Sequence, residues 1–358
     1  MPTEAGGTRV GAPTNVAIVS NHWKLDGWSE PPNDSVVGTP DRHPGSVRRT
    51  AHINVTWPGG EGAPMRLTGR GRDLLTPSSG DPQPIAYDEM DMEVDEQLIA
   101  SVEVRPAREG VKALVGSHSS RRFRSSLDAA LPGERAAGTP LYFMLDDIAI
   151  LSRIGGIAWS QHRPPALPQD TEDSEELNAV RERIRRGPAL CSGLRPGGYN
   201  AISFEKKISW PHHFRIAGDL SNPDDPWAWH ELGRVPEVCF RRRRRVDVWR
   251  DADSIEVDAH YRDSVWGDHH TELSLHEYSL RATINPKSHA LLSVAVMPRV
   301  LPFPECPSAS QHATSLVGTM VDDFRASVNE SLRGLECCTH LNDMLRGLAE
   351  VPALAQLL

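Results

Sequence analysis

The sequence lacks the features that mark disulfide-stabilised, membrane-embedded or secreted proteins. Its 358 residues include only five cysteines, an odd and widely spread set that does not form a disulfide framework. No run approaches the roughly 20 apolar residues that a membrane helix needs. The opening segment, Met1 to Pro13, has no apolar core of the kind that signal peptides carry. We therefore expect a cytoplasmic protein whose thiols are reduced.

An excess of positive charge is also missing. The formal net charge is −9, so the chain has no general electrostatic attraction to nucleic acid or to an anionic membrane, and we expect neither partner. The hydrophobic fraction of 39% is enough to form a core. The remaining partner that the sequence indicates is a small-molecule substrate, and composition does not predict the oligomeric state.

Alternating apolar and polar residues predict two sets of strands. The first set covers residues 50–57, 65–70, 90–94 and 98–104, and the second covers 245–249, 254–261, 275–284 and 290–296. Helices are predicted after each set. In the first set they cover 111–131, where Gly116 and polar residues break the helical stretch, and 141–154; in the second they cover 306–317, 320–332 and 339–348. A further helix is predicted at 174–186, and the apolar run 16–19 is a candidate edge strand. The fold class is therefore α+β, with antiparallel strands followed by helices.

Composition divides the chain into four parts. Residues 1–45 are rich in proline and glycine and are predicted to form a flexible N-terminal arm. Residues 46–158 form a first α+β module, 159–238 a loop-rich connector, and 239–358 a second α+β module.

An ordered series of matches indicates that the second module repeats the first. Residues 71–73 (GRD) correspond to 261–263 (YRD), and 114–116 to 316–318 (LVG in both). The other matches are 48–50 with 244–246, 123–124 with 324–325, and 141–146 with 338–343. Internal duplication is the prediction, and coincidental alternation of strands and helices is the alternative.

Several phrases of the second module are recognisable together. They are HYRDS at 260–264, LHEY at 275–278, PRVLPFPECP at 298–307 and CTHLNDMLR at 338–346. Over roughly residues 45–355 the chain resembles a bacterial family catalogued only as a domain of unknown function. This resemblance implies no reaction.

The order of elements in the second module is also similar to that of NifU-like iron–sulfur assembly scaffolds. Cys306, the LVG turn at 316–318 and Cys338 stand where those proteins have a cysteine, a turn and a final cysteine. The resemblance implies a NifU-like pseudo-dimer. Ser274 and His276 replace the cysteine and aspartate of the scaffold's Cys-Gly-Asp motif, which puts assembly of a labile cluster in doubt.

Cysteine and histidine in the second module form the candidate site. Cys306 and Cys338 are predicted at helix N-termini, where the helix dipole favours thiolate, and His340 and His276 are predicted nearby. Thiolate and imidazole together suit zinc or iron. Asp343 or Glu305 would then act either as a hydrogen-bonding partner of a metal ligand or as the base. The alternative is that both cysteines are small buried hydrophobic residues. The first module has Leu141 and Phe143 in the positions of Cys338 and His340.

A run of five arginines precedes the second set of strands. Arg241, Arg243 and Arg245 would lie on one face of a strand and hold a phosphate-bearing cofactor or substrate such as a coenzyme A thioester. The alternative is that they are solvated or paired with acids. The pairs His212–His213 and His269–His270 lie in predicted loops without nearby thiols and are weak metal-site candidates.

Two functions from different classes follow. The first is a metal- or thiolate-dependent hydrolase, with an acyl thioester as the expected substrate class. The second is a non-catalytic protein that handles a metal, an iron–sulfur unit or sulfur. The serine at position 274 favours the hydrolase.

Overall fold

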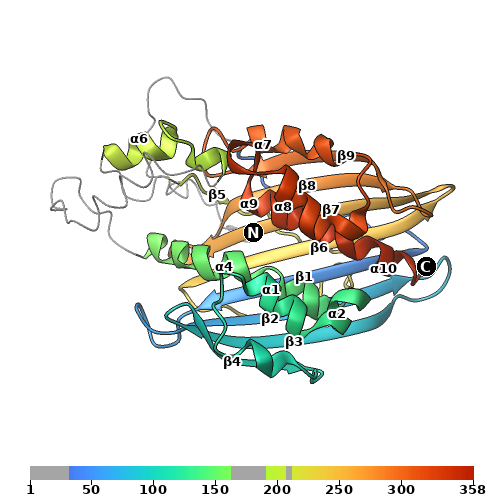
Figure 1. Cartoon of the computed structure of the whole chain (residues 1–358), viewed down its shortest axis with the longest axis horizontal. Coiled ribbons are helices and arrows are strands. Elements are labelled where there is room, and N and C mark those ends of the chain that lie inside the picture. The colour runs from blue at the N-terminus through green and yellow to red at the C-terminus, as the bar shows by residue number, and fades with distance from the viewer. Residues whose placement is uncertain (1–31, 163–190, 207–211) are drawn as a thin grey trace, which may run out of the picture.

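The computed structural model describes residues 32–162, 191–206 and 212–358. Its framework is a nine-stranded antiparallel sheet in the order β4-β3-β2-β1-β6-β7-β8-β5, with β9 also paired to β8. Helices lie across one face of this sheet (Figure 1). The strands are β1 (Ser46–Thr56), β2 (Met65–Thr76), β3 (Gln83–Asp95), β4 (Leu98–Arg105), β5 (Arg215–Ile216), β6 (Cys239–Asp251), β7 (Ser254–Trp266), β8 (Glu272–Ile284) and β9 (Leu291–Val300).

Short helices follow each set of strands. Those of the first set are η1 (Val111–Leu114), α1 (Phe123–Ala130), α2 (Pro132–Ala137), α3 (Pro140–Leu145), α4 (Ile148–Ile154) and η2 (Gly155–Gln161). Those of the second set are α7 (Ser308–Gln311), η5 (His312–Leu316), η6 (Val321–Asp323), α8 (Phe324–Ser331), η7 (Gly334–Glu336), α9 (Thr339–Arg346), η8 (Gly347–Glu350) and α10 (Val351–Ala355). Between the sets lie η3 (Ser192–Leu194) and α6 (Tyr199–Glu205), and η4 (Asp268–His270) joins β7 to β8.

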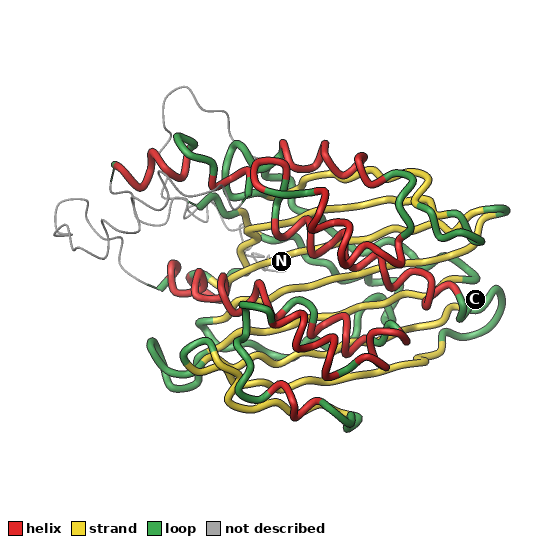
Figure 2. The backbone as a smooth tube through the Cα atoms, in the orientation of Figure 1, coloured by secondary structure: helices red, strands yellow, loops and turns green. Residues whose placement is uncertain are grey.

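The sheet consists of two four-stranded meanders, which we call the first half (β1–β4 with the helices up to residue 162) and the second half (β6–β9 with the helices from residue 308). The two meet at the centre, where β1 and β6 pair antiparallel with Ala51 opposite Arg244. This pairing makes the sheet continuous. Each half places its own helices on the same face, so the two helical layers lie side by side (Figure 2).

The two halves share their hydrogen-bonding pattern in detail. In the first half Ile99 donates to the Ser117 carbonyl and accepts from the Gly116 N–H, at 2.9 and 2.8 Å. In the second half Leu291 makes the same two bonds to Thr319 and Gly318, also at 2.9 and 2.8 Å. Both glycines have positive φ, +81° and +90°, which explains why a glycine ends the LVG turn in each half.

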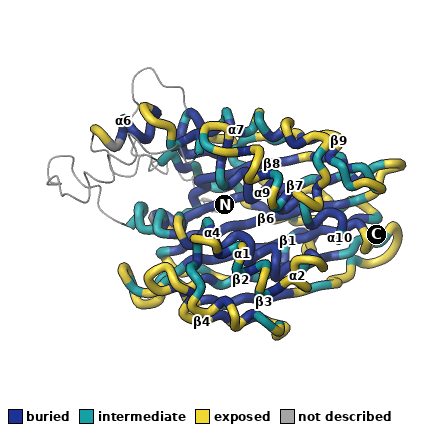
Figure 3. The backbone as a smooth tube through the Cα atoms, viewed as in Figure 1, coloured by how far each residue is buried: buried dark blue, intermediate teal, exposed yellow. Residues whose placement is uncertain are grey.

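Buried ion pairs also occupy corresponding positions. Arg49 on β1 lies directly opposite Asp73 on β2 and holds both of its carboxylate oxygens, at 2.7 and 2.6 Å. Arg242 on β6 lies opposite Asp263 on β7 and holds both oxygens at 2.8 and 3.0 Å. The central strands are buried on both faces, so these charges need partners inside the protein (Figure 3).

Extended segments cover the sheet face that the helices leave open. Ser35 and Val36 hydrogen-bond to Glu277, and the Thr39 hydroxyl donates to the Leu220 carbonyl. His230 contacts Thr50 and His52 of β1. These segments belong to the predicted arm and the predicted connector. The strand predicted at 16–19 and the helix predicted at 174–186, which belong to the same two regions, lie outside the described residues.

The mixed helix and strand architecture with antiparallel strands is confirmed, and each strand predicted within the described residues overlaps an observed one. The break predicted at Gly116 within 111–131 is confirmed, since Gly116 has positive φ just after η1 and α1 begins only at Phe123. One detail is wrong. The sequence match pairs Arg48 with Arg244 and therefore Arg49 with Arg245. The strand ladders and ion pairs instead make Arg242 the counterpart of Arg49, three residues earlier. Five consecutive arginines give no marker of register.

Candidate functional site

A cavity of about 240 Å³ under the helices brings together sulfur and imidazole groups from distant parts of the chain. Its lining includes three thiols and three imidazoles, so we call it the thiol–imidazole cavity. These residues are Cys191, Cys306, Cys338, His212, His276 and His340. The apolar wall comes from Ile150, Ile154, Ile157, Leu194, Pro302 and Phe303. The four predicted metal ligands therefore line one cavity, together with a cysteine and a histidine that were not predicted.

Strand register places His276. It lies on β8 directly opposite Asp263 of β7, which in turn lies opposite Arg242 of β6. Cross-strand neighbours share one face of a sheet, so these three side chains all point toward the helices. His276 is nearly fully buried there, and its Nδ1 has no hydrogen-bond partner among the described residues.

The start of α9 places Cys338 and His340. Cys338 is the N-cap residue and has extended backbone angles, so its side chain turns back toward the sheet. The Tyr278 hydroxyl donates to its Sγ at 3.2 Å, and backbone N–H groups of Leu341 and His340 also point to this sulfur. Cys338 therefore stands at the N-terminus of a helix, as predicted. Cys306 was also predicted at a helix N-terminus, but it lies two residues before α7 begins.

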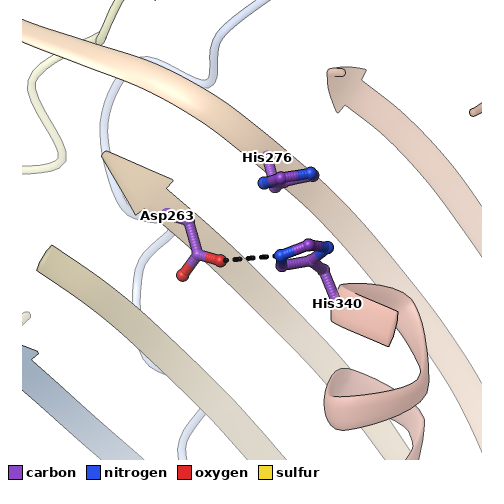
Figure 4. A group of neighbouring side chains, drawn as sticks. All are labelled: Asp263, His276 and His340. Carbon is purple, nitrogen blue, oxygen red and sulfur yellow. Dashed lines mark ion pairs between the residues drawn. The ribbon is translucent and has the colours of Figure 1, made fainter. Parts of the chain in front are cut away.

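His340 stands between a thiol and a carboxylate. Its Nδ1 is 3.7 Å from Cys338 Sγ, and its Nε2 is 3.7 Å from Asp263 Oδ2. Its ring is stacked on that of His276, with centroids 3.4 Å apart and planes 15° from parallel. Figure 4 shows the two rings, one above the other, beside the Asp263 carboxylate. Ligand atoms of Asp263, His276 and His340 all lie within 4.8 Å of one another.

Asp263 is already engaged by other groups. Both of its oxygens accept from Arg242, and Oδ2 also accepts from the Tyr261 hydroxyl at 2.9 Å. A carboxylate bound in this way is fixed in position and keeps its charge. It is therefore suited to orient His340 through Nε2, leaving Nδ1 on the side of Cys338.

Cys306 reaches the cavity from the loop after β9. A side chain at Gly193 would place its Cβ only 2.6 Å from Cys306 Sγ, so the segment around η3 packs directly against this sulfur. Cys191, which directly precedes η3, lines the cavity as well. A glycine is required at position 193 because no larger residue fits above the thiol.

Burial sets the protonation states of the site. Burial raises the pKa of Cys306 far above its usual value, with the neighbouring Cys338 and Cys191 adding to the effect. Burial also raises the pKa of Cys338, although the Tyr278 hydroxyl and two backbone N–H groups act in the other direction. The helix N-terminus therefore does not keep Cys338 ionised in the metal-free protein, contrary to the sequence-based expectation.

The imidazoles are shifted toward the neutral form. Burial lowers the pKa of His276 well below its usual value, and the adjacent His340 lowers it further. The pKa of His340 falls through burial and the nearby Arg242. Neutral imidazole is the form that binds metal ions.

The two predicted bases lie away from the cavity lining. Asp343 is almost fully buried, and its carboxylate is shared between Arg124 and Arg242 at 2.5 and 2.9 Å. Glu305 accepts from the backbone N–H of Tyr199 at 2.6 Å, at the start of α6. Both carboxylates therefore hold elements of the fold together.

The predicted phosphate-binding arginines lie on the other face of the sheet. Arg241, Arg243 and Arg245 alternate with Arg242, which faces the helices. All three are buried: Arg241 donates to Asn54 at 2.6 Å, Arg243 pairs with Glu272, and Arg245 pairs with Asp247 and Asp258. They are paired with other groups, as the alternative interpretation held, and have no part in the function proposed below.

The second half also agrees with a known family. Residues 240–354 match the model of a family described as "Protein of unknown function (DUF2889)". The match spans the strands, the cavity residues from His276 onward and the final helices, but neither Cys191 nor His212. No curated protein and no solved structure matches the chain. None of the described helices is long and apolar enough to cross a bilayer.

Sequence reasoning missed Cys191 and His212 because they lie in the predicted connector, far from the other thiols. Their proximity to prolines and glycines indicated loops and nothing more. The closest available signal was position: His212 precedes by three residues the short strand β5, which pairs with β8 just before His276.

A second cavity occupies the corresponding place in the first half. It has a volume of about 480 Å³, and its lining includes Asp73, Ala86 and Pro140 together with residues of α10. Ala86 lies opposite Asp73 in the ladder, as His276 lies opposite Asp263. We call it the first-half cavity. No thiol lines it, and its one imidazole, His289, comes from the turn before β9.

Proposed function

We propose that this protein binds one zinc or iron ion in the thiol–imidazole cavity through His276, Cys338 and His340. The observation that carries the proposal is the 3.7 Å separation of Cys338 Sγ and His340 Nδ1. In a tetrahedral site with Zn–S near 2.3 Å and Zn–N near 2.0–2.1 Å, sulfur and nitrogen ligands lie about 3.6 Å apart. The two atoms are therefore spaced as two corners of a metal tetrahedron.

The surrounding groups support the same assignment. His276 is buried and shifted toward the neutral form, and its ligand atom lies within 4.8 Å of those of His340 and Asp263, so it is placed to supply a second nitrogen. The Asp263 carboxylate lies 3.7 Å from Nε2 of His340, so its charge would favour the proton on Nε2 and leave Nδ1 for the metal, as second carboxylates do beside metal-bound histidines. A bound cation would also lower the pKa of Cys338, which burial otherwise keeps protonated.

Three protein ligands would leave a fourth position for water, as in catalytic zinc sites. We propose that the ion, when bound, would supply a nucleophilic hydroxide from water for attack on the carbonyl carbon of an acyl thioester, while His276, Cys338 and His340 would hold the ion. The carbon–sulfur bond then breaks, giving a carboxylic acid and a thiolate, which takes up the proton released by the water. The metal replaces the base that Asp343 or Glu305 was expected to provide.

The second candidate is a non-catalytic metal or sulfur handler. The observation that favours it is the presence of two more thiols, Cys306 and Cys191, in the same cavity. If Cys306 is a fourth ligand, the site is closed, and closed sites are typical of structural ions. Against an iron–sulfur scaffold, Ser274 donates to Glu277 on the opposite face of the sheet, so its position does not face the cavity.

We further infer that the two halves arose by internal duplication, giving the NifU-like pseudo-dimer expected from the order of elements. The matched bonds of Ile99 and Leu291 and the matched pairs Arg49–Asp73 and Arg242–Asp263 support this. In that case one half kept or gained the metal ligands and the other serves the fold.

Metal analysis of the purified full-length chain tests the proposal. We expect close to one equivalent of zinc or iron, lost in Cys338→Ser and in His340→Phe but retained in Cys337→Ser, a matched change at the neighbouring thiol. Cys306→Ser separates the two candidates, because it keeps the ion if the site is open and loses it if Cys306 is a ligand.

Hydrolysis of short acyl thioesters by the metal-loaded protein is the accompanying assay. Wild-type protein without bound metal after reconstitution would refute the metal site. Iron accompanied by labile sulfide would favour the second candidate.

A further inference from the structure

We propose that Arg153 binds a terminal oxyanion, a carboxylate or phosphate, on the substrate of the thiol–imidazole cavity. The inference rests on the proposed function, since it concerns what enters the same cavity. It assigns the substrate class: a short acyl compound with an apolar body and a negatively charged group at the end away from the reacting carbonyl.

Arg153 is the one cation among the cavity-lining residues. It lies in the last turn of α4, so it comes from the first half, whereas Cys338 and His340 come from the second. The residue is exposed, unlike the ligands at the inner end of the cavity. It therefore stands where a ligand entering from solvent would leave its polar end.

Within the described part of the chain, the side chain of Arg153 makes no hydrogen bond and no ion pair. This is unusual for the arginines around the helix–sheet interface. Arg124, Arg242, Arg325 and Arg346, for example, all bind carboxylates there. An arginine whose five N–H donors are unused, beside an apolar cavity, is suited to hold a planar carboxylate or a phosphate.

The corresponding residue of the second half shows that the charge is not needed by the fold. Counting along the helices from Leu141 and Cys338, position 153 corresponds to Glu350. Glu350 is fully buried and pairs with Arg325, with Arg49 3.6 Å away. At the place related to Glu350, Asp343 of α9 supplies the negative charge for Arg124 and Arg242 instead, and the Arg153 side chain lines the cavity.

Size and wall chemistry limit the rest of the substrate. A cavity of about 240 Å³ is smaller than the roughly 300–1,000 Å³ of pockets that enclose drug-sized ligands. The apolar wall of the same cavity includes Ile150, Ile154, Ile157 and Phe303. A short hydrocarbon chain fits these walls, while a nucleotide does not.

Binding of simple probes to the purified metal-loaded protein tests the inference by calorimetry. Hexanoate and butyl phosphate carry the oxyanion, and hexanamide has a similar body without charge. We expect wild-type protein to bind at least one of the two anions about tenfold more tightly than hexanamide, and Arg153→Gln to lose that preference. The relative affinity of the two anions identifies the oxyanion. Arg281→Gln, which removes another exposed arginine, should behave as wild type.

Equal affinity of wild-type protein for anion and amide, no binding of any probe, or an unchanged preference in Arg153→Gln would overturn the inference. Metal content is measured on the same samples. If Arg153→Gln keeps its metal and its anion preference, only the role of Arg153 fails. If wild-type protein holds no metal, the proposed function fails, and the calorimetric comparison on the metal-free chain still decides whether Arg153 selects anions.

Discussion

The thiol–imidazole cavity and the first-half cavity lie in the same place on the same framework but differ in chemistry. In one, His276 stands opposite Asp263 and Cys338 caps the helix that packs on it. In the other, Ala86 stands opposite Asp73, and Leu141 and Phe143 occupy the places of Cys338 and His340. The ladders, turns and buried ion pairs are shared, so they belong to the fold. The sulfur and imidazole groups are not shared, so the fold does not require them.

Comparing the two halves at one strand position shows a structural contact in the first half and a contact to a proposed metal ligand in the second. Asp88 and Tyr278 correspond in the two ladders, and both bind the first residues of the packed helix. Asp88 accepts from the Leu141 backbone N–H at 3.0 Å, whereas Tyr278 donates to Cys338 Sγ at 3.2 Å. A backbone contact that fixes the helix in one half is replaced by a contact to a potential metal ligand in the other.

The largest expected effect comes from the paired aspartates. Asp73→Asn and Asp263→Asn each remove the carboxylate that a buried arginine binds at two points. Glu350 remains near Arg49, and Asp343 remains near Arg242, so each change should lower the free energy of unfolding by at most about 3–5 kcal/mol. Only Asp263→Asn should also weaken metal binding. Urea denaturation together with metal analysis checks both statements. Equal loss of metal in the two variants would mean that general destabilisation, and not the site, explains it.

Leu141→Ala is the next test. Leu141 is fully buried, and removing it should lower the free energy of unfolding by about 2–5 kcal/mol while leaving the metal content unchanged. Cys338→Ser at the corresponding position should remove the metal. The comparison breaks down if Leu141→Ala also loses metal at a temperature where it remains folded.

The turn glycines should respond equally. Gly116→Ala and Gly318→Ala each force alanine into a left-handed conformation, at about 1–2 kcal/mol. Nothing lies within 4 Å of the added Cβ at either position, so backbone strain is the whole effect. Gly133→Ala, at a helical glycine with equal space, should be neutral or stabilising. Chemical denaturation of the three variants decides this, and clearly unequal costs at 116 and 318 would show that the two turns differ.

The smallest effect concerns pH. Burial lowers the pKa of His260 to about 4, whereas its first-half counterpart is Arg70, which pairs with Glu89. The unfolded chain takes up a proton near pH 6.5 that folded His260 resists. Its contribution to stability is therefore complete above pH 6.5 and is lost as the pH falls toward 4.

We expect a loss of about 1 kcal/mol from this residue between pH 7 and pH 5.5. His260→Gln should make the pH dependence of urea unfolding shallower by that amount. A variant with the same pH slope as wild-type protein would show that His260 is not the titrating group.

Much of the fold could be predicted because strands alternate and turns carry glycine. The residues 98–104 and 275–284, for instance, are strands close to the predicted bounds. The four predicted metal ligands line one cavity because each lies next to a strand or helix boundary that the sequence marks. Charge pairing could not be predicted: Arg242 and Asp263, or Asp343 and Arg124, meet only through sheet register and helix packing. Cys191 and His212 were missed for the same reason, since loops carry no periodicity.

The most direct test is a crystal structure of the metal-loaded protein, with anomalous diffraction recorded at the absorption edge of the bound metal. The account predicts one anomalous peak in the thiol–imidazole cavity, about 2.3 Å from Cys338 Sγ and about 2.0–2.1 Å from the Nδ1 of His340. It predicts no peak in the first-half cavity. A peak in both cavities, or none near Cys338, would contradict the claim that one half carries the chemistry and the other serves the fold.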